Sequence, residues 1–181
     1  RDDKGYTIAN ATIMEHTIMP STFRYLRQFL PLFKQEYSSL NLRFSLDFFK
    51  DLFSSKKWSL DGISPFEHLR VLDPITREKD VAVIQKNLHS VFPELRDLKI
   101  VEAWSGMVEA SPDVIPVIDE VGDFSGFYVA TGFSGHGFGI GPGAGKAISE
   151  MLLNNSGSVD MRPFKLSRFL DGTRIRPSGS I

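Results

Sequence analysis

Apolar residues recur at helical spacing in five segments, which are the predicted helices. The first begins at Pro20 and carries an apolar stripe from Phe23 to Phe33; Pro31 is expected to break or end it. The other four are expected at residues 46–53, from Ser64 onward, at 77–92 before Pro93, and from Pro142 to about Leu153.

Runs of β-branched, aromatic or alternating residues predict the strands. Residues 5–10 and 12–19 are interpreted as a strand pair with a turn at Asn10, and residues 41–46 as a short strand. Residues 98–111 are expected to form one longer strand, bent at Gly106. The run GFYVAT, from Gly126 to Thr131, is so apolar that we expect a strand buried on both faces, in the middle of a sheet. The pattern predicts a mixture of helix and strand.

Composition excludes several classes of function. The chain has 181 residues, of which 41% are hydrophobic and 24% charged, as in ordinary globular domains. A net charge of -1 with scattered basic residues gives no case for nucleic acid. The absence of cysteine excludes disulfides, thiolate metal sites and a cysteine nucleophile. No apolar run approaches the roughly 18 residues of a membrane span, and no signal-peptide pattern opens the sequence, so we expect a cytoplasmic protein without a membrane span.

Seven of the 15 glycines lie from Gly132 to Gly145, after the last predicted strand and into the start of the last predicted helix. Glycine loses more backbone freedom on folding than any other residue, so this density indicates backbone that lies close against a ligand or another piece of chain. A helix N-terminus also stabilises negative charge. A Walker loop is excluded because Ala147 follows Gly145-Lys146. The formal G-x-G-x-x-A match that begins at Gly139 starts too far from the strand to be a dinucleotide fingerprint.

Two blocks in this order carry a specific resemblance. SPDVIPVID, and then GFYVATGFSGHGFGIGPGAGKAISEML from Gly126, resemble the C-terminal signature of the FAD-dependent oxidoreductases that include D-amino acid oxidase, sarcosine oxidase and glycine oxidase. The upstream residues are more loosely similar to that family's substrate-binding domain. The resemblance implies an α+β fold: a substrate-binding-type mixed or antiparallel sheet with helices, plus the C-terminal strand, loop and helix of a Rossmann-like FAD-binding domain.

The resemblance also implies a division of the chain. Residues 1–110 would be the substrate-binding region, 111–155 the return into the FAD-binding domain, and 156–181 a tail. The family's N-terminal dinucleotide-binding half has no counterpart here. We therefore expect a C-terminal fragment, or less simply one subunit of a split enzyme, that is inactive alone, binds FAD weakly or not at all, and tends to self-associate.

In the family, a hydride passes from the carbon beside an amine nitrogen to the flavin, so the implied substrate is a small amine or amino acid. By resemblance, the flavin edge would be contacted by Ser134, Gly135, His136, Gly137, Phe138, Gly139, Ile140 and Gly141. His136 is the one ionisable residue between Thr131 and Lys146 and is a candidate for proton transfer; flavin contact, or a hydrogen bond within the loop only, are the alternatives.

The usual anchors for a substrate carboxylate are absent. Sarcosine oxidases often carry Lys after GHGF, where this chain has Gly139, and relatives with Arg after the preceding Gly-hydrophobic pair correspond here to Val108. Arg43 and His16 are candidate cations, and Trp104 is a candidate pocket wall. The rival hypothesis is a non-catalytic module whose glycine-rich loop binds an anionic ligand or a partner protein.

Overall fold

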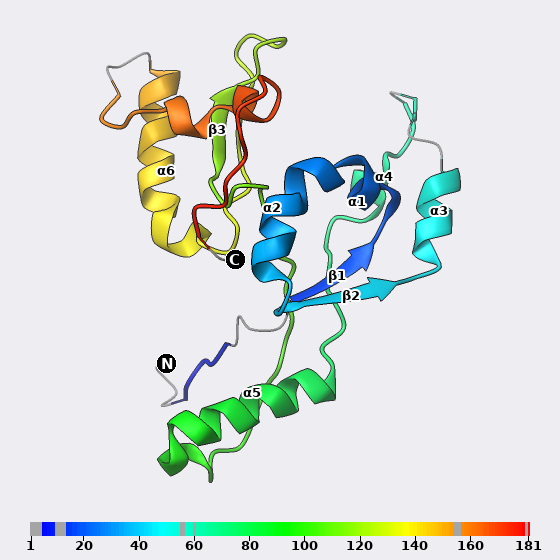
Figure 1. The fold of residues 1–181 in the computed structure, drawn as a ribbon, viewed down its shortest axis with the longest axis vertical. Helices are drawn as coiled ribbons and strands as arrows, with labels where there is room; N and C mark the ends of the chain where they lie inside the picture. Colours follow the sequence, from blue (N-terminus) through cyan, green and yellow to red (C-terminus); the bar gives the residue numbers. More distant parts are fainter. Residues whose placement is uncertain (1–4, 10–13, 55–56, 60, 154–156, 180) are drawn as a thin grey trace. The chain divides into compact units, whose positions relative to one another are not determined.

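The computed structural model describes residues 5–9, 14–54, 57–59, 61–153, 157–179 and 181 (Figure 1). The chain divides into two compact units. Unit 1 takes its described residues from the ranges 1–18 and 41–107, and unit 2 from 19–40 and 108–181. The assignment of these parts to substrate and FAD binding stays a prediction.

Unit 1 contains a two-stranded sheet and helices. Its elements are β1 (Met14–Ile18), β2 (Leu40–Phe44, apart from its first residue), α3 (Asp47–Phe53), α4 (Pro65–His68), α5 (Glu78–Val91) and the 3-10 helix η1 (Pro93–Leu95). Strand β1 pairs with β2. Helix α4 begins at Pro65 because Ser64 caps it: the Ser64 hydroxyl accepts from the Glu67 N–H at 3.2 Å.

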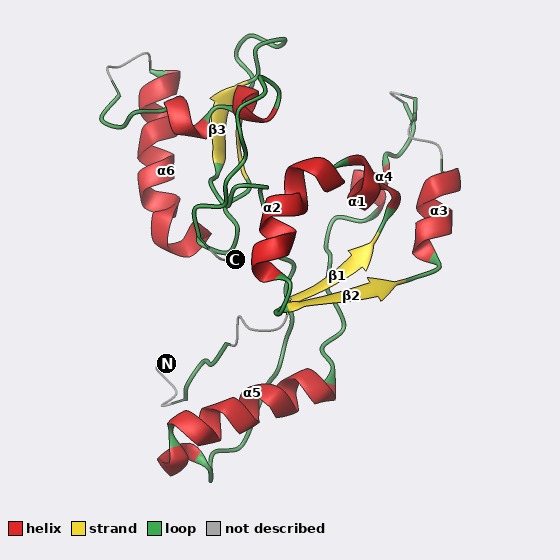
Figure 2. Ribbon diagram, viewed as in Figure 1, coloured by secondary structure: helices red, strands yellow, loops and turns green. Residues whose placement is uncertain are grey.

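The described residues of unit 2 form a β-hairpin, α-helices and 3-10 helices (Figure 2). Its elements are α1 (Pro20–Arg24), α2 (Leu26–Glu36), β3 (Val117–Glu120), β4 (Tyr128–Thr131), α6 (Gly137–Leu152), η2 (Arg162–Phe164) and η3 (Leu166–Phe169). Strands β3 and β4 are antiparallel, with Val117 opposite Thr131 and Glu120 opposite Tyr128. The small apolar core of this unit consists of Leu32, Val114, Val117, Ile118 and Ala147.

The helix predictions hold except at two boundaries. Helices form at 47–53, 65–68 and 78–91, and the last stops before Pro93 as expected. The predicted break at Pro31 is wrong, because α2 continues through Pro31 to Glu36 and the break falls at Tyr25. The predicted start of the last helix at Pro142 is also wrong, because α6 begins at Gly137 and contains Pro142.

Three strand predictions need correction. Residues 5–9 and 98–109 form no strand, and β1 pairs with β2 instead; the Asn10 turn lies outside the described residues. Within 98–109, apolar side chains such as Val101 and Met107 are exposed and have no partner strand. In the described part of the chain β4 pairs with β3 alone and is only half-buried, so it is neither central in a sheet nor covered on both faces.

Within the described residues, no helix is both long enough and apolar enough to cross a membrane. The cytoplasmic location stays a prediction.

Candidate functional site

The glycine-rich stretch forms the turn between β4 and α6 and the first turns of α6. Gly132 and Gly135 have φ of +71° and +82°, a backbone conformation that residues with a side chain rarely adopt. A Cβ on Gly132 would also lie 3.1 Å from the Ser111 Cβ. These two glycines are therefore required by the turn itself.

The glycines within α6 are a different case. A Cβ on Gly139, Gly141, Gly143 or Gly145 would meet nothing within 4 Å among the described residues. Neither packing nor backbone strain in this chain requires them. They leave one end of the helix bare, so another molecule can approach its backbone closely.

The first turn of α6 has unpaired donors. The Gly139 and Ile140 N–H groups donate to the His136 carbonyl at 3.0 and 3.1 Å. The N–H groups of Gly137 and Phe138 have no acceptor among the described residues, and the His136 side chain does not cap the helix. The positive end of the helix dipole and two free donors therefore point outward at the same place.

The predicted flavin-contact residues divide into an exposed set and one buried member. The side chains of His136 and Ile140 are exposed and that of Phe138 fully so, while Gly135 and Gly139 are open to solvent and Gly137 and Gly141 are half-buried. Ser134 is only 1% exposed. Its hydroxyl accepts from the Ser111 N–H at 3.1 Å and donates to the Gly132 carbonyl at 3.1 Å. Its side chain therefore supports the turn from within.

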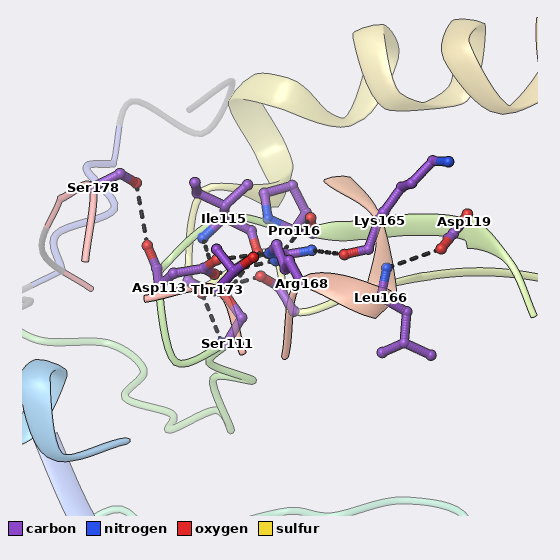
Figure 3. Close-up of polar contacts among 12 residues, drawn as sticks. Ser111, Asp113, Ile115, Pro116, Asp119, Lys165, Leu166, Arg168, Thr173 and Ser178 are labelled. Carbon is purple, nitrogen blue, oxygen red and sulfur yellow. Dashed lines mark hydrogen bonds and ion pairs between the residues drawn. The ribbon is translucent and has the colours of Figure 1, made fainter. Parts of the chain in front are cut away.

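A buried ion pair beneath this turn was missed in the sequence. The Arg168 Nε lies 2.7 Å from the Asp113 Oδ2, and the two side chains are 11% and 8% exposed (Figure 3). The Arg168 Nη2 also donates to the Asp113 Oδ1 at 3.1 Å and to the Ile115 carbonyl at 2.7 Å. The tail from Arg162 onward, which showed no period in the sequence, is thus joined to the segment before β3. The aspartate in SPDVIPVID was the one feature of the sequence that could have pointed to this ion pair.

The candidate substrate residues belong to unit 1. Arg43 is exposed and pairs with Glu15 at 3.2 Å, and Glu15 also pairs with Arg77. His16 is exposed on β1. Trp104 is 59% exposed and lies on no strand, contrary to expectation. The structure thus gives each candidate a place within unit 1.

Two surface hollows of the described residues lie along α5, and no predicted site residue lines either of them. One is lined by Gln85, Lys86, His89 and Arg96 among others, and the other by Thr76, Val81 and Ala103 among others. No group of three His, Asp or Glu in the described part of the chain could hold a metal ion.

Comparison with known proteins gives the site its context. The profile of the family described as DAO, FAD dependent oxidoreductase, matches residues 54–151. Human peroxisomal sarcosine oxidase is 31% identical over 91 residues, which are 50% of this chain and 23% of that protein. N-methyl-L-tryptophan oxidase of Salmonella dublin is 41% identical over 96 residues, 50% of this chain and 26% of that protein.

A solved structure extends the likeness to the fold. The L-amino acid deaminase of Proteus myxofaciens, in complex with anthranilate, has a TM-score of 0.79 and 25% identity, and the alignment covers 87% of this chain and 35% of that one. The chain belongs to the DAO family of FAD-dependent oxidoreductases. It spans about a quarter of the length of the two curated relatives named above.

The family is FAD dependent, and the residues present fit a flavin. A flavin becomes more negative along one edge when it is reduced. The Gly137 and Phe138 donors and the bare glycines that follow provide positive charge without steric obstruction. This side of the chain is therefore suited to the edge of such a ring.

Proposed function

We propose that this chain supplies the flavin-edge part of an oxidoreductase that oxidises the C–N bond of an amine or amino acid. The observation that carries the proposal is the open N-terminal half of α6, with two unpaired N–H donors in its first turn and four glycines that nothing in the described chain covers. When bound, FAD would accept the hydride that leaves the substrate carbon. The family match is what makes flavin the favoured ligand for this turn.

The backbone of α6 would act electrostatically. The N–H groups of Gly137 and Phe138 and the helix dipole favour negative charge beside them, and they need no reorganisation because the helix already holds them in place. The other residues from Gly135 to Gly141 would hold the ligand by close backbone contact. Ser134 would contribute by keeping the turn in shape, because its hydroxyl is used inside unit 2.

His136 is the candidate for proton transfer. Its side chain is exposed at the N-cap of α6, beside the free donors. In this position it can hold or move a proton at the same face of the helix. The alternative role, contact with flavin or substrate without proton transfer, uses the same position.

For the substrate we propose a small amine or amino acid. The names of the relatives, which include sarcosine, N-methyl-L-tryptophan and L-amino acid enzymes, support this class. Arg43 is the proposed cation for a carboxylate, and Trp104 the proposed wall. Since Arg43 pairs with Glu15, an incoming carboxylate would have to compete with that contact.

We further propose that the chain acts as part of a longer flavoenzyme and binds FAD weakly alone. The share of the relatives that it spans supports this. The affinity for a cofactor of this size is spread over its length, so the contacts at one flavin edge supply only part of it. A tendency to self-associate and a cytoplasmic location also stay predictions.

The test has two arms. FAD is titrated into the purified 181-residue chain while flavin fluorescence is followed, and little binding is expected in the micromolar range. A longer polypeptide that joins this chain to a dinucleotide-binding half is expected to be yellow and to be bleached anaerobically by an amine or amino acid. Tight one-to-one binding in the first arm would contradict the partial site, and a colourless longer protein would favour the non-catalytic binding module.

A matched pair of variants locates the flavin. Gly139→Val places a branched side chain on the bare face of α6, whereas Gly122→Val makes the same change in the hairpin turn, where a Cβ also meets nothing within 4 Å. In the longer protein, FAD affinity is expected to fall in Gly139→Val and to be retained in Gly122→Val. Equal FAD affinity in the two variants would show that this face of α6 is not part of the flavin site.

A further inference from the structure

A chain of buried polar contacts runs from the tail of unit 2 to the turn before α6. Arg168 forms the ion pair with Asp113 and also donates to the Ile115 carbonyl. The same Ile115 carbonyl accepts from the Ser111 hydroxyl at 2.8 Å. Ser111 in turn donates its N–H to the Ser134 Oγ at 3.1 Å. Every link is a direct hydrogen bond; Asp113 and both serines are buried, and the Arg168 side chain is 11% exposed.

Two residues at or beside these contacts have a backbone in an unfavourable conformation. Val114 and Ser134 are the non-glycine residues with positive φ among those described, at 64° and 51°. A branched side chain makes the Val114 conformation costly, and such conformations persist only where the surroundings impose them. The Val114 N–H donates to the Ser111 carbonyl at 3.2 Å, and the Ser134 N–H to the Glu109 carbonyl at 3.0 Å. Ser111 therefore connects both strained residues.

We infer that Arg168 is a positioning residue for the N-terminal turn of α6, acting through Ile115, Ser111 and Ser134. Its planar guanidinium fixes a carboxylate and a carbonyl at once, which the single ammonium of a lysine does not reproduce. The fixed Ile115 carbonyl holds the Ser111 hydroxyl at 2.8 Å, and that hydroxyl lies 3.4 Å from the Ser134 Oγ. Ser134 is then held where its own hydroxyl reaches the Gly132 carbonyl.

The inference deepens the proposed function. The effect of Arg168 on the flavin edge rests on that proposed function. Two residues after Ser134 the chain reaches His136, and the unpaired donors of Gly137 and Phe138 follow at once. A change in the orientation of Ser134 changes the direction of these N–H groups. Arg168 would thereby influence the flavin edge without touching it.

The test uses the isotope-labelled 181-residue chain and its amide NMR spectrum, without flavin. Arg168→Lys keeps the positive charge but removes the planar guanidinium that binds a carboxylate and a carbonyl at once. Arg162→Lys is the matched control, because Arg162 lies on the same tail and pairs with Asp160 but is exposed. The amide resonances of Ser134 to Phe138 are expected to move in Arg168→Lys and to stay in place in Arg162→Lys. Shifts confined to Asp113, Ile115 and the neighbours of residue 168 would overturn the inference.

Ser111→Ala tests the path and remains available if the arginine variant does not fold. It removes the hydroxyl contact to Ile115 and leaves the ion pair in place. The amide resonances of the same turn are expected to move in Ser111→Ala. In the double variant with Arg168→Lys, the resonances of Gly135 to Phe138 should move no further than in Ser111→Ala alone. Independent, additive shifts would refute a path through Ser111.

A second readout separates this inference from the proposed function. In the flavin-loaded longer protein, Arg168→Lys is expected to shift the flavin reduction potential, and Arg162→Lys is not. Moved resonances without a change in potential would leave the positioning role standing and count against the flavin assignment. Resonances that stay in place refute the positioning role whatever the flavin does.

Discussion

The two units differ in what they bury. Unit 2 encloses five apolar side chains and a buried ion pair, whereas Ser64 is the one buried residue among those described in unit 1. Unit 1 is nevertheless rich in aromatic residues: Phe44, Phe48 and Phe49 form ring contacts at 5.4–5.9 Å, and Trp58 contacts Phe66 at 5.8 Å. Most of these rings are half-exposed or exposed.

The difference indicates that the two units are stabilised to different extents by burial of their own side chains. Burial of apolar area drives folding, so unit 2 holds much of its own structure while unit 1 gains little from the side chains it covers. An exposed apolar surface of this kind is typical of a region that is completed by another molecule.

Arg168→Met is expected to destabilise unit 2 by about 3–5 kcal/mol, because it leaves the Asp113 carboxylate buried without its partner. Hydrogen exchange of the β3 and β4 amides measures this loss. Both tryptophans, Trp58 and Trp104, lie in unit 1, so their fluorescence reports unfolding there and should be unchanged. Arg162→Met is the control, and its exposed ion pair should contribute nothing measurable. A parallel shift in the tryptophan transition would show that the units are not independent.

Leu32→Ala in α2 is expected to cost about 2–4 kcal/mol, because Leu32 is buried and its removal leaves a cavity. Leu52→Ala in α3 makes the same change inside a helix of unit 1, where the side chain is half-exposed, and should cost clearly less. Denaturant titration followed by circular dichroism compares the two. Similar losses would contradict the difference in burial between the units.

Two glycine substitutions separate the turn of unit 2 from its helix. Gly132→Ala is expected to destabilise by about 1–2 kcal/mol, because alanine disfavours the left-handed backbone and its Cβ would approach Ser111. Gly139→Ala should stabilise the chain by about 0.5–1 kcal/mol, since alanine favours a helix and meets no neighbour. Thermal unfolding measures both. A destabilised Gly139→Ala would mean that this face is already covered.

The smallest effect concerns the start of α4 in unit 1. The Ser64 N–H donates to the Glu67 carboxylate at 2.8 Å, and this backbone bond, followed by the bond to the Ser64 hydroxyl, lowers the pKa of Glu67 below its ordinary value of 4.5. Its stabilising contribution is therefore present above pH 4.5 and is lost as the pH falls through the lowered pKa. The carboxyl resonance of Glu67 should titrate at higher pH in Ser64→Ala. An unchanged titration would show that the cap does not persist in solution.

The helices were predictable because their signals are local. Ser64-Pro65 and Pro93 set helix boundaries within a few residues, and the structure follows them. The strand prediction at 98–109 failed because a strand needs a partner, and the partner is not part of the local pattern. The prediction for the apolar run before Gly132 was wrong for the same reason. Its composition is that of a strand covered on both faces, whereas burial depends on which other segments pack against it.

The position of the turn between β4 and α6 was predictable, but its construction was not. The glycine density located the turn, yet the sequence placed the start of the helix five residues late, because Pro142 is usually a first-turn residue. Ser134 could not be distinguished from its exposed neighbours, since nothing in the order of residues showed that Ser111 lies beneath it. The Arg168–Asp113 pair joins positions 55 residues apart, so no periodicity could link them.

The position of Pro142 inside α6 has a mechanical consequence. Proline has no N–H, so the Phe138 carbonyl lacks the donor that would normally join it to the next turn. The first turn, Gly137 to Gly141, is thus attached to the remainder of the helix by one bond fewer, with a glycine on either side of the proline. We expect this end of the helix to tilt more easily than the turns from Ala144 to Leu152, which would let it follow the plane of the proposed flavin ring.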